Sequence, residues 1–332
     1  MDLQKILDQK IKDLPVGPHI IGLKAVMAHI DAAIKHYKRG QAEPDQTLFT
    51  DVVFRCNQAF EGSIKEAYRV LAGKDPSRIA PHKIEEFLGE ADLLRKKVLD
   101  QFTRYRTEWR NPSTHDYTLD FDEDEGLMAI VSVTVFAIVL CDQIDGKLAF
   151  DTAADPRTLA ATPTTRQGTP LLDLVTNALL RFAQGHTEDP LISLDHLRQH
   201  YLRTIGTIAG YLVSALRGVP GVSVKQSQVF SDREADIVVE RSTGVSSTEK
   251  VIVELKISSS GKPKSLPRRF LQRSAVEKAS FFLHLPDVTG AVVFLYSGSD
   301  KTYSIADTTE APIEKMRIVG PVSDTRLERL RD

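Results

Sequence analysis

Cysteine is scarce in this chain of 332 residues, which contains only Cys56 and Cys141. Two cysteines provide neither a disulfide framework nor the paired spacing of a zinc site. Such a sequence suits a reducing compartment best. The first five residues carry no apolar signal region. We therefore expect a cytoplasmic protein.

Long hydrophobic runs are also missing. The longest uncharged apolar stretch, 126–141, has 16 residues, whereas a membrane-spanning helix needs about 18–20. Acidic residues flank this stretch on both sides, so we expect a buried helix and no membrane contact. The sequence also lacks a glycine-rich phosphate loop and a nucleophile elbow, which disfavours most small-molecule enzymes.

Neither sign of charge is in excess, because 43 basic and 45 acidic residues give a net charge of −2. This balance excludes a globally basic nucleic-acid coat protein but allows a local basic patch. A hydrophobic share of 42% can form sizeable cores. At roughly 100–200 residues per domain, the length predicts two domains.

The spacing of apolar residues predicts an α+β protein with two different halves. Residues 1–150 have helical periodicity and predict an all-α bundle, and 151–168, rich in alanine and threonine, predicts a linker. Residues 169–332 predict an α/β domain. The expected helices are 20–34, 47–72, 81–110, one from 122, 171–182, 194–216 and 267–285, and the expected strands are 222–229, 236–240, 251–257 and 291–296.

A first candidate site lies at Arg110-Asn111-Pro112-Ser113-Thr114-His115, where Asn111-Pro112 is expected to end a helix. Histidine exchanges protons near neutral pH, and arginine holds phosphate in a forked geometry. RNA carries its own nucleophile, the 2′-hydroxyl, so its cleavage requires no metal. Taken alone, this spacing is more typical of an ordinary helix end, where basic groups contact the last carbonyls.

This motif, Arg-x4-His between helices of a bundle, resembles the signature of the HEPN superfamily, and residues 57–68 resemble the second helix of such bundles. The resemblance covers about 18–148. It implies a metal-independent ribonuclease without cofactor that acts as a homodimer. Arg110 would clamp phosphate, Asn111 would orient it, and His115 would transfer protons. Other members of the superfamily are inactive or serve as partners of toxins.

Residues 116–125 contain six acidic residues and no basic one. Asp122 and Glu125 have the spacing of a capping box, which favours a helix start here. The alternative is an acidic segment that keeps a toxic nuclease inactive. The helix that follows is apolar nearly all round, so either the bundle core or a second protomer covers it.

A second candidate site combines Asp236 with Glu254 and Lys256. In the strand 251–257, Glu254 and Lys256 share one face, and a hairpin with the preceding strand would bring Asp236 close to Glu254. Two carboxylates can hold Mg²⁺, and a lysine beside them can position water or stabilise developing charge. The plain alternative is a strand with charged residues on its wet face.

The three residues and the order α-β-β-β-α-β resemble the PD-(D/E)xK superfamily of restriction endonuclease-like proteins over about 194–297. The resemblance implies a Mg²⁺-dependent nuclease with Asp236 and Glu254 as metal ligands. Ala235 replaces the usual proline, and Gln272 could match a glutamine of some subfamilies. The helix 194–216 lacks a central acid that some members use, which leaves the number of metal sites open.

The segment 250–278 is basic, with a net charge of +6. Phosphate contacts depend on such charge, and the alternative is a solvated basic loop. Its eight basic residues are Lys250, Lys256, Lys262, Lys264, Arg268, Arg269, Arg273 and Lys278. We expect Lys262, Lys264, Arg268, Arg269, Gln272 and Arg273 to bind nucleic acid.

Together, the two resemblances imply a nuclease of a prokaryotic antiviral defence or toxin system. One domain would cleave RNA without metal and the other DNA with Mg²⁺, and a cognate regulator is a possible partner. The first alternative is that only one domain is catalytic and the other serves dimerisation or binding. The second is a non-enzymatic sensor that binds nucleic acid or a partner.

Overall fold

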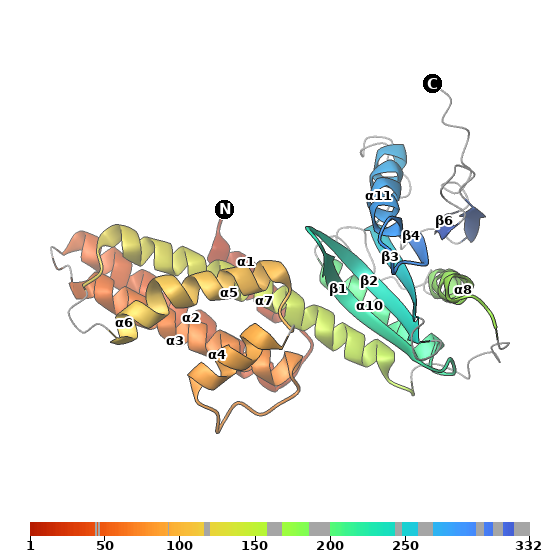
Figure 1. Ribbon diagram of the computed structural model, residues 1–332. Coiled ribbons are helices and arrows are strands. Elements are labelled where there is room, and N and C mark those ends of the chain that lie inside the picture. Colours follow the sequence, from red (N-terminus) through yellow and green to blue (C-terminus); the bar gives the residue numbers. More distant parts are fainter. Residues whose placement is uncertain are drawn as a thin grey trace. The chain divides into compact units, whose positions relative to one another are not determined.

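A computed structural model of the protein describes residues 1–43, 45, 47–91, 93–115, 120–157, 168–185, 200–242, 248–257, 268–296, 302–307 and 315–321, with the side chains of 114, 115, 268–272, 306 and 307 outside the description. The chain divides into a first unit, Met1–Leu148, and a second unit, Ala149–Asp332. The first is helical and the second contains a mixed β-sheet (Figure 1). The protein is therefore α+β, as the sequence predicts.

The helices of the first unit pack around a cluster of aromatic rings. The ring centroids of Phe60 and Tyr105 lie 4.7 Å apart, and those of Phe60 and Phe136 lie 5.4 Å apart. Stacked and tilted rings at such distances add to the energy of apolar burial. The elements are α1 (Leu3–Asp13), α2 (Pro18–Ala42), α3 (Thr47–Leu71), α4 (Pro81–Glu90), α5 (Lys96–Tyr105), the π-helical turn η1 (Arg106–Arg110), α6 (Asn111–His115) and α7 (Glu123–Ala154).

The prediction of one continuous helix over 81–110 is wrong, because the chain leaves the helix between α4 and α5. Gln143 of α7 contacts the chain at this break. Its amide nitrogen donates to the carbonyl of Leu93, and its amide oxygen accepts from the backbone N–H of Arg95 at 3.2 Å. A tertiary contact thus satisfies backbone groups that a helix would otherwise pair.

The expected helix end at Asn111-Pro112 is also wrong, because the chain passes through η1 into α6. In the wider π turn, the N–H of Asn111 bonds to the carbonyl of Arg106. Pro112 is the second residue of α6 and directly follows this turn, so the residue without an N–H lies where the helical hydrogen-bond pattern changes.

The capping box at the start of α7 is confirmed. The N–H of Glu125 donates to Asp122 Oδ1 at 2.9 Å, and the N–H of Asp122 donates to Glu125 Oε2 at 3.0 Å. This reciprocal pair satisfies two of the N–H groups that a helix start leaves without partners. The acidic residues at 122 and 125 thus have a structural role.

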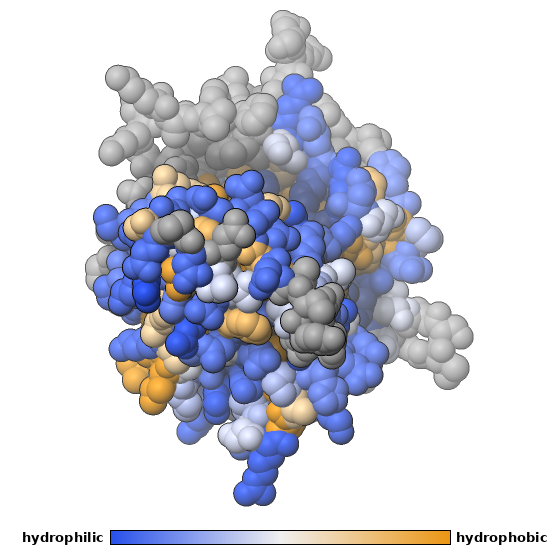
Figure 2. Space-filling model, turned by 90° about the vertical axis from the view of Figure 1, so that its left-hand side faces the viewer, coloured by the Kyte–Doolittle hydropathy of each residue, from blue (hydrophilic) through white to orange (hydrophobic). Residues whose placement is uncertain are grey.

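Helix α7 is the one described helix that is long and apolar enough to cross a membrane, and half of its most apolar window is buried inside the protein. Three large apolar side chains of its first turns, Leu127, Met128 and Val131, are exposed. Figure 2 shows one face of the molecule, on which hydrophobic residues form separate groups within a largely hydrophilic surface. The bundle core therefore covers part of the apolar surface of α7 and leaves these three side chains outside.

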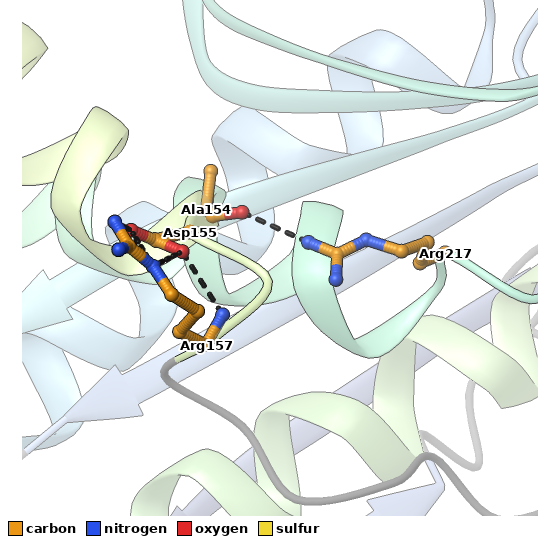
Figure 3. A network of polar contacts seen from close by, with 4 residues as sticks. All are labelled: Ala154, Asp155, Arg157 and Arg217. Carbon is orange, nitrogen blue, oxygen red and sulfur yellow. Dashed lines mark hydrogen bonds and ion pairs between the residues drawn. The ribbon is translucent and has the colours of Figure 1, made fainter.

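The predicted linker begins too early, because α7 continues to Ala154. Arg217 donates to the carbonyl of Ala154 at 2.9 Å, and Arg157 pairs with Asp155 at 2.6 Å (Figure 3). Arg217 thereby satisfies one of the carbonyls that a helix end leaves unpaired. Of the remaining predicted linker, 158–167 lie outside the described residues.

The second unit contains a six-stranded sheet of order β1-β2-β3-β4-β6-β5. The pairs β1–β2, β2–β3 and β5–β6 are antiparallel, whereas β3–β4 and β4–β6 are parallel. The strands are β1 (Val222–Phe230), β2 (Arg233–Ser242), β3 (Thr248–Ile257), β4 (Gly290–Tyr296), β5 (Tyr303–Asp307) and β6 (Met316–Pro321). The four predicted strands match β1 to β4, and β5 and β6 were not predicted.

Helices cover both faces of this sheet. Alternate residues of β4 separate the two faces, since Val292 and Phe294 belong to one buried cluster and Val293 to another. The first cluster includes α8 (Leu171–Gly185) and α10 (Tyr201–Ala215), and the second includes α11 (Arg268–Leu283). These helices match the predicted ones, except that 194–199 lie outside the described residues.

Candidate active site

The pairing of β2 and β3 brings Asp236 and Glu254, the acid pair, to the same place in the sheet. Ile237 pairs with Val253. Asp236 directly precedes Ile237 and Glu254 directly follows Val253, so in this antiparallel ladder the two acids lie next to that pair. Val253 and its alternate neighbours on β3 pack against α8 and α10. Glu254 and Lys256 therefore share the opposite face, which α11 covers, as the alternation of the sequence predicts.

Asp236 is held by two hydrogen-bond donors. The N–H of Leu255 donates to Asp236 Oδ2 at 2.8 Å, and the hydroxyl of Tyr201 lies 3.0 Å from the same oxygen. The Tyr201 hydroxyl is also 3.1 Å from the carbonyl of Leu255. Oδ2 is thus occupied by contacts with β3 and α10, which leaves Oδ1 as the oxygen available to a ligand.

Glu254 is completely buried, with 0% of its surface exposed. Lys278 of α11 lies with its Nζ 2.6 Å from Glu254 Oε2 and 3.9 Å from Asp236 Oδ1. Both oxygens of Glu254 are buried without a hydrogen-bond partner among the described residues, so the contact with Lys278 is an ion pair. Burial, and then the charge of Asp236, raise the pKa of Glu254 to about 8, against the opposing effect of Lys278 and Lys256.

The acid pair fits a hard divalent cation. Within the described residues, no group of three or more histidine, cysteine, aspartate or glutamate side chains gathers to hold a metal. Mg²⁺ commonly takes only one or two carboxylates and keeps several waters. Glu254 Oε1, buried without a partner, is the kind of oxygen that such an ion would satisfy. Asp236 and Glu254 would therefore hold the ion.

Two lysines belong to this site, and the sequence identified one of them by its motif. Lys256 is half-buried on the same face of β3 as Glu254. Lys278 contacts both acids, yet in the sequence it is only one of eight basic residues of a basic segment. Its position on the helix that follows β3 is the one signal that could have singled it out.

The predicted nucleic-acid contacts are described only in part. Lys262 and Lys264 lie outside the described residues. Arg268, Arg269 and Gln272 lie on α11, and their side chains are outside the description. Arg273 is exposed, and its Nε lies 3.0 Å from Glu277 Oε1.

In the first unit, Arg110 faces a buried carboxylate. Arg110 Nε lies 3.2 Å from Oε1 of Glu85 on α4, and both side chains are largely buried. Burial raises the pKa of Glu85, and the charge of Arg110 opposes this effect. The charge of Arg110 is therefore already balanced from within the bundle.

The chain around Arg110 is tied to α3. Tyr105 donates to Asn57 Oδ1 at 3.0 Å, Asn57 donates to Ser113 Oγ at 2.6 Å, and Ser113 donates to the carbonyl of Arg110 at 3.2 Å. Arg110 and Asn111 line a pocket of about 630 Å³. His115 is the last residue of α6, and its side chain lies outside the description. The pocket is also lined by His82, Glu85, Glu86, Gly89, Glu90, Leu99, Phe102, Thr103 and Arg106.

The chain has no match among family models, curated proteins or solved structures. Its chemistry is therefore inferred from the two candidate sites. The site on the sheet offers two carboxylates, an unpaired buried oxygen and two lysines. The site in the bundle offers an arginine that already faces a glutamate. The acid pair is thus the stronger candidate for catalysis.

Proposed function

We propose that the second unit is a divalent-metal-dependent nuclease of the PD-(D/E)xK type, with DNA as its expected substrate. The observation that carries this proposal is that Asp236 and Glu254 converge on one ammonium group, with Lys256 on the same face of β3. The order of elements supports it, because three antiparallel strands are followed by α11 and a parallel fourth strand.

The residues of the site have separate tasks in this proposal. Tyr201 and the N–H of Leu255 fix the carboxylate of Asp236 so that Oδ1 remains available. Glu254 supplies a second oxygen from a fully buried side chain. Bound Mg²⁺ would supply an activated water and neutralise charge on the phosphate. Lys256 would stabilise the negative charge that develops on the phosphate during hydrolysis.

The test is cleavage of labelled DNA and RNA by the purified full-length protein, with Mg²⁺ or with EDTA. We expect Mg²⁺-dependent cleavage by the wild type and none by Asp236→Asn. Asp232→Asn is the matched control, because Asp232 is exposed in the turn between β1 and β2. Cleavage by Asp236→Asn at the wild-type rate, or no cleavage by any form, would refute the proposal.

A second candidate function is metal-independent RNA cleavage by the first unit. It is favoured by the pocket beside the motif, where Arg110 and Asn111 lie with Arg106 and His82. We expect single-stranded RNA to be cut in EDTA by the wild type and not by His115→Ala. If RNA stays intact in EDTA while DNA is cut with Mg²⁺, only the second unit is catalytic and the first serves dimerisation or binding.

The biological role and the assembly follow from the two resemblances. They favour a nuclease of a prokaryotic defence or toxin system that acts in the cytoplasm as a homodimer, with a cognate regulator as a further partner. The exposed side chains of Leu127, Met128 and Val131 are of the kind that a dimer interface would cover. Sedimentation of the wild type and of Met128→Glu tests the dimer.

A further inference from the structure

We infer that Lys278 is a built-in counter-ion of the acid pair, and that a divalent cation binds only by displacing its ammonium group. This inference rests on the proposed metal site and concerns its regulation. The ammonium lies between the two acids, 2.6 Å from Glu254 Oε2 and 3.9 Å from Asp236 Oδ1. It thus occupies the space where a cation bridging the two carboxylates would be bound.

The charges of the site explain why the two cations exclude each other. When both carboxylates are ionised, one ammonium group balances one of them and leaves the acid pair with an excess negative charge. A divalent ion would balance both carboxylates. Like charges a few ångströms apart in a poorly solvated site repel strongly. An ammonium and a divalent ion therefore compete for the acid pair.

The structure lets Lys278 leave without moving its helix. Ala275, Ala279 and Phe282 of α11 are fully buried against the sheet, so the helix backbone is fixed. The side chain of Lys278 is 28% exposed. Four methylene groups give the ammonium a flexible stem that can swing toward water. The exchange needs only a rotamer change.

Lys256 lacks this position. It shares the strand face with Glu254, yet among the described residues no ion pair joins it to either acid. Its charge has the smallest of the effects on the pKa of Glu254, smaller than that of Lys278. The two lysines thus differ in kind, because only Lys278 has to move when a metal binds.

The first test measures the affinity of the metal-free full-length protein for Mg²⁺ by titration calorimetry. We expect Lys278→Met to bind Mg²⁺ about tenfold more tightly or better, since one competing positive charge is removed. Lys225→Met is the matched control, because Lys225 also pairs with a glutamate, Glu240, and lies away from the acid pair. Its affinity should equal that of the wild type.

The outcomes separate this inference from the proposed function. Mg²⁺ binding by the wild type with equal or weaker binding by Lys278→Met would overturn the exchange and leave the metal site standing. No Mg²⁺ binding by any form would overturn both. Thermal unfolding of each variant without metal shows whether it is folded, and Lys278→Gln, which keeps a hydrogen-bond donor, replaces Lys278→Met if the latter unfolds.

A second measurement needs no variant at α11. Lysine acylation followed by mass spectrometry reports how accessible each amine is with and without Mg²⁺. We expect labelling of Lys278 to increase severalfold when Mg²⁺ saturates the protein. The labelling of Lys250 should not change, because its Nζ pairs with Glu240 Oε1 at a distance of 3.3 Å and takes no part in the acid pair. Unchanged labelling of Lys278 at saturating Mg²⁺ would refute displacement.

Discussion

Each unit contains a buried glutamate that faces a cation from another secondary-structure element. In the first unit, Glu85 of α4 lies 3.2 Å from Arg110. In the second, Glu254 of β3 lies 2.6 Å from Lys278. Burial raises the pKa of both glutamates. The two pairs differ in their surroundings, because a second carboxylate, that of Asp236, lies 3.9 Å from the Lys278 ammonium group.

This difference separates a structural ion pair from a candidate catalytic site. Glu85 and Arg110 form an ion pair between two largely buried side chains, and such a pair avoids leaving either charge uncompensated. Lys278 faces two carboxylates, and both oxygens of Glu254 are buried without a hydrogen-bond partner among the described residues. An unsatisfied buried acceptor costs free energy unless a ligand or ion satisfies it. Glu85 Oε1 also lacks a hydrogen-bond partner among the described residues, so the second carboxylate, Asp236, is the feature that sets the acid pair apart.

The largest expected effect is on cleavage by the second unit. We expect Glu254→Gln to lower Mg²⁺-dependent cleavage by about 10³-fold or more, the scale seen when one member of a concerted catalytic set is removed. Glu249→Gln is the control, because Glu249 lies on the same strand and pairs with Arg241, away from the acid pair. Initial rates with labelled DNA measure both. Equal cleavage rates for Glu254→Gln and Glu249→Gln would contradict a catalytic role of Glu254.

The next effect is on the stability of the first unit. We expect Glu85→Ala to lower its free energy of unfolding by about 3 kcal/mol, since the largely buried guanidinium of Arg110 loses the carboxylate that it faces. Trp109 is the only tryptophan and is buried in this unit, so its fluorescence in a urea titration reports the first unit alone. Glu86→Ala, an exposed neighbour, should change stability by less than about 0.5 kcal/mol.

The double variant Glu85→Leu/Arg110→Met sharpens this prediction. Replacing a buried ion pair by apolar side chains of similar volume is often neutral. We expect the double variant to recover most of the stability that Glu85→Ala loses. A double variant as unstable as the single one would mean that Arg110 stabilises the bundle by contacts other than this pair.

The acid pair could be predicted from the sequence because its geometry is local. Alternation along β3 fixes which residues face α11, and a hairpin with β2 fixes which residue lies opposite Glu254. Lys278 could not be placed in this way. Its distance from Glu254 depends on how α11 crosses the sheet, and that crossing is set by the packing of Ala275, Ala279 and Phe282.

The ion pair of Glu85 and Arg110 could not be predicted from the sequence, because the expected helix would have kept the two residues apart. In the single helix expected over 81–110, these residues would lie about 37 Å apart at 1.5 Å per residue. They meet because the chain leaves the helix between α4 and α5. Gln143 of α7 donates a hydrogen bond to the carbonyl of Leu93 in the connecting segment. A contact between residues 50 positions apart in the sequence cannot be read from the local spacing of apolar residues.

The raised pKa of Glu254 should also make the stability of the second unit depend on pH. The pKa of Glu254, raised to about 8 from 4.5, means that the folded protein binds its proton more tightly than the unfolded chain. The stability gained from that proton is fully present below pH 4.5 and is lost as the pH rises toward 8. The slope is at most about 1.4 kcal/mol per pH unit.

The measurement compares wild type with Glu254→Gln by calorimetry in EDTA between pH 5 and pH 9. The difference between the two isolates Glu254, because its charged neighbours, Asp236, Lys278 and Lys256, are common to both proteins. We expect the variant to become relatively more stable as the pH rises. A difference that does not change with pH would mean that Glu254 keeps an ordinary pKa.

The smallest expected effect concerns Tyr201, a positioning residue that acts through Asp236. Tyr201→Phe removes the hydroxyl that lies 3.0 Å from Asp236 Oδ2, while Leu255 still donates to that oxygen. One hydrogen bond contributes about 0.5–1.5 kcal/mol, so we expect kcat for DNA cleavage to fall by up to about tenfold. KM should stay unchanged, since the hydroxyl is directed at the carboxylate and at Leu255. A fall in stability with an unchanged kcat would show that Tyr201 only joins α10 to the sheet, as Glu85 joins α4 to the Arg110 segment.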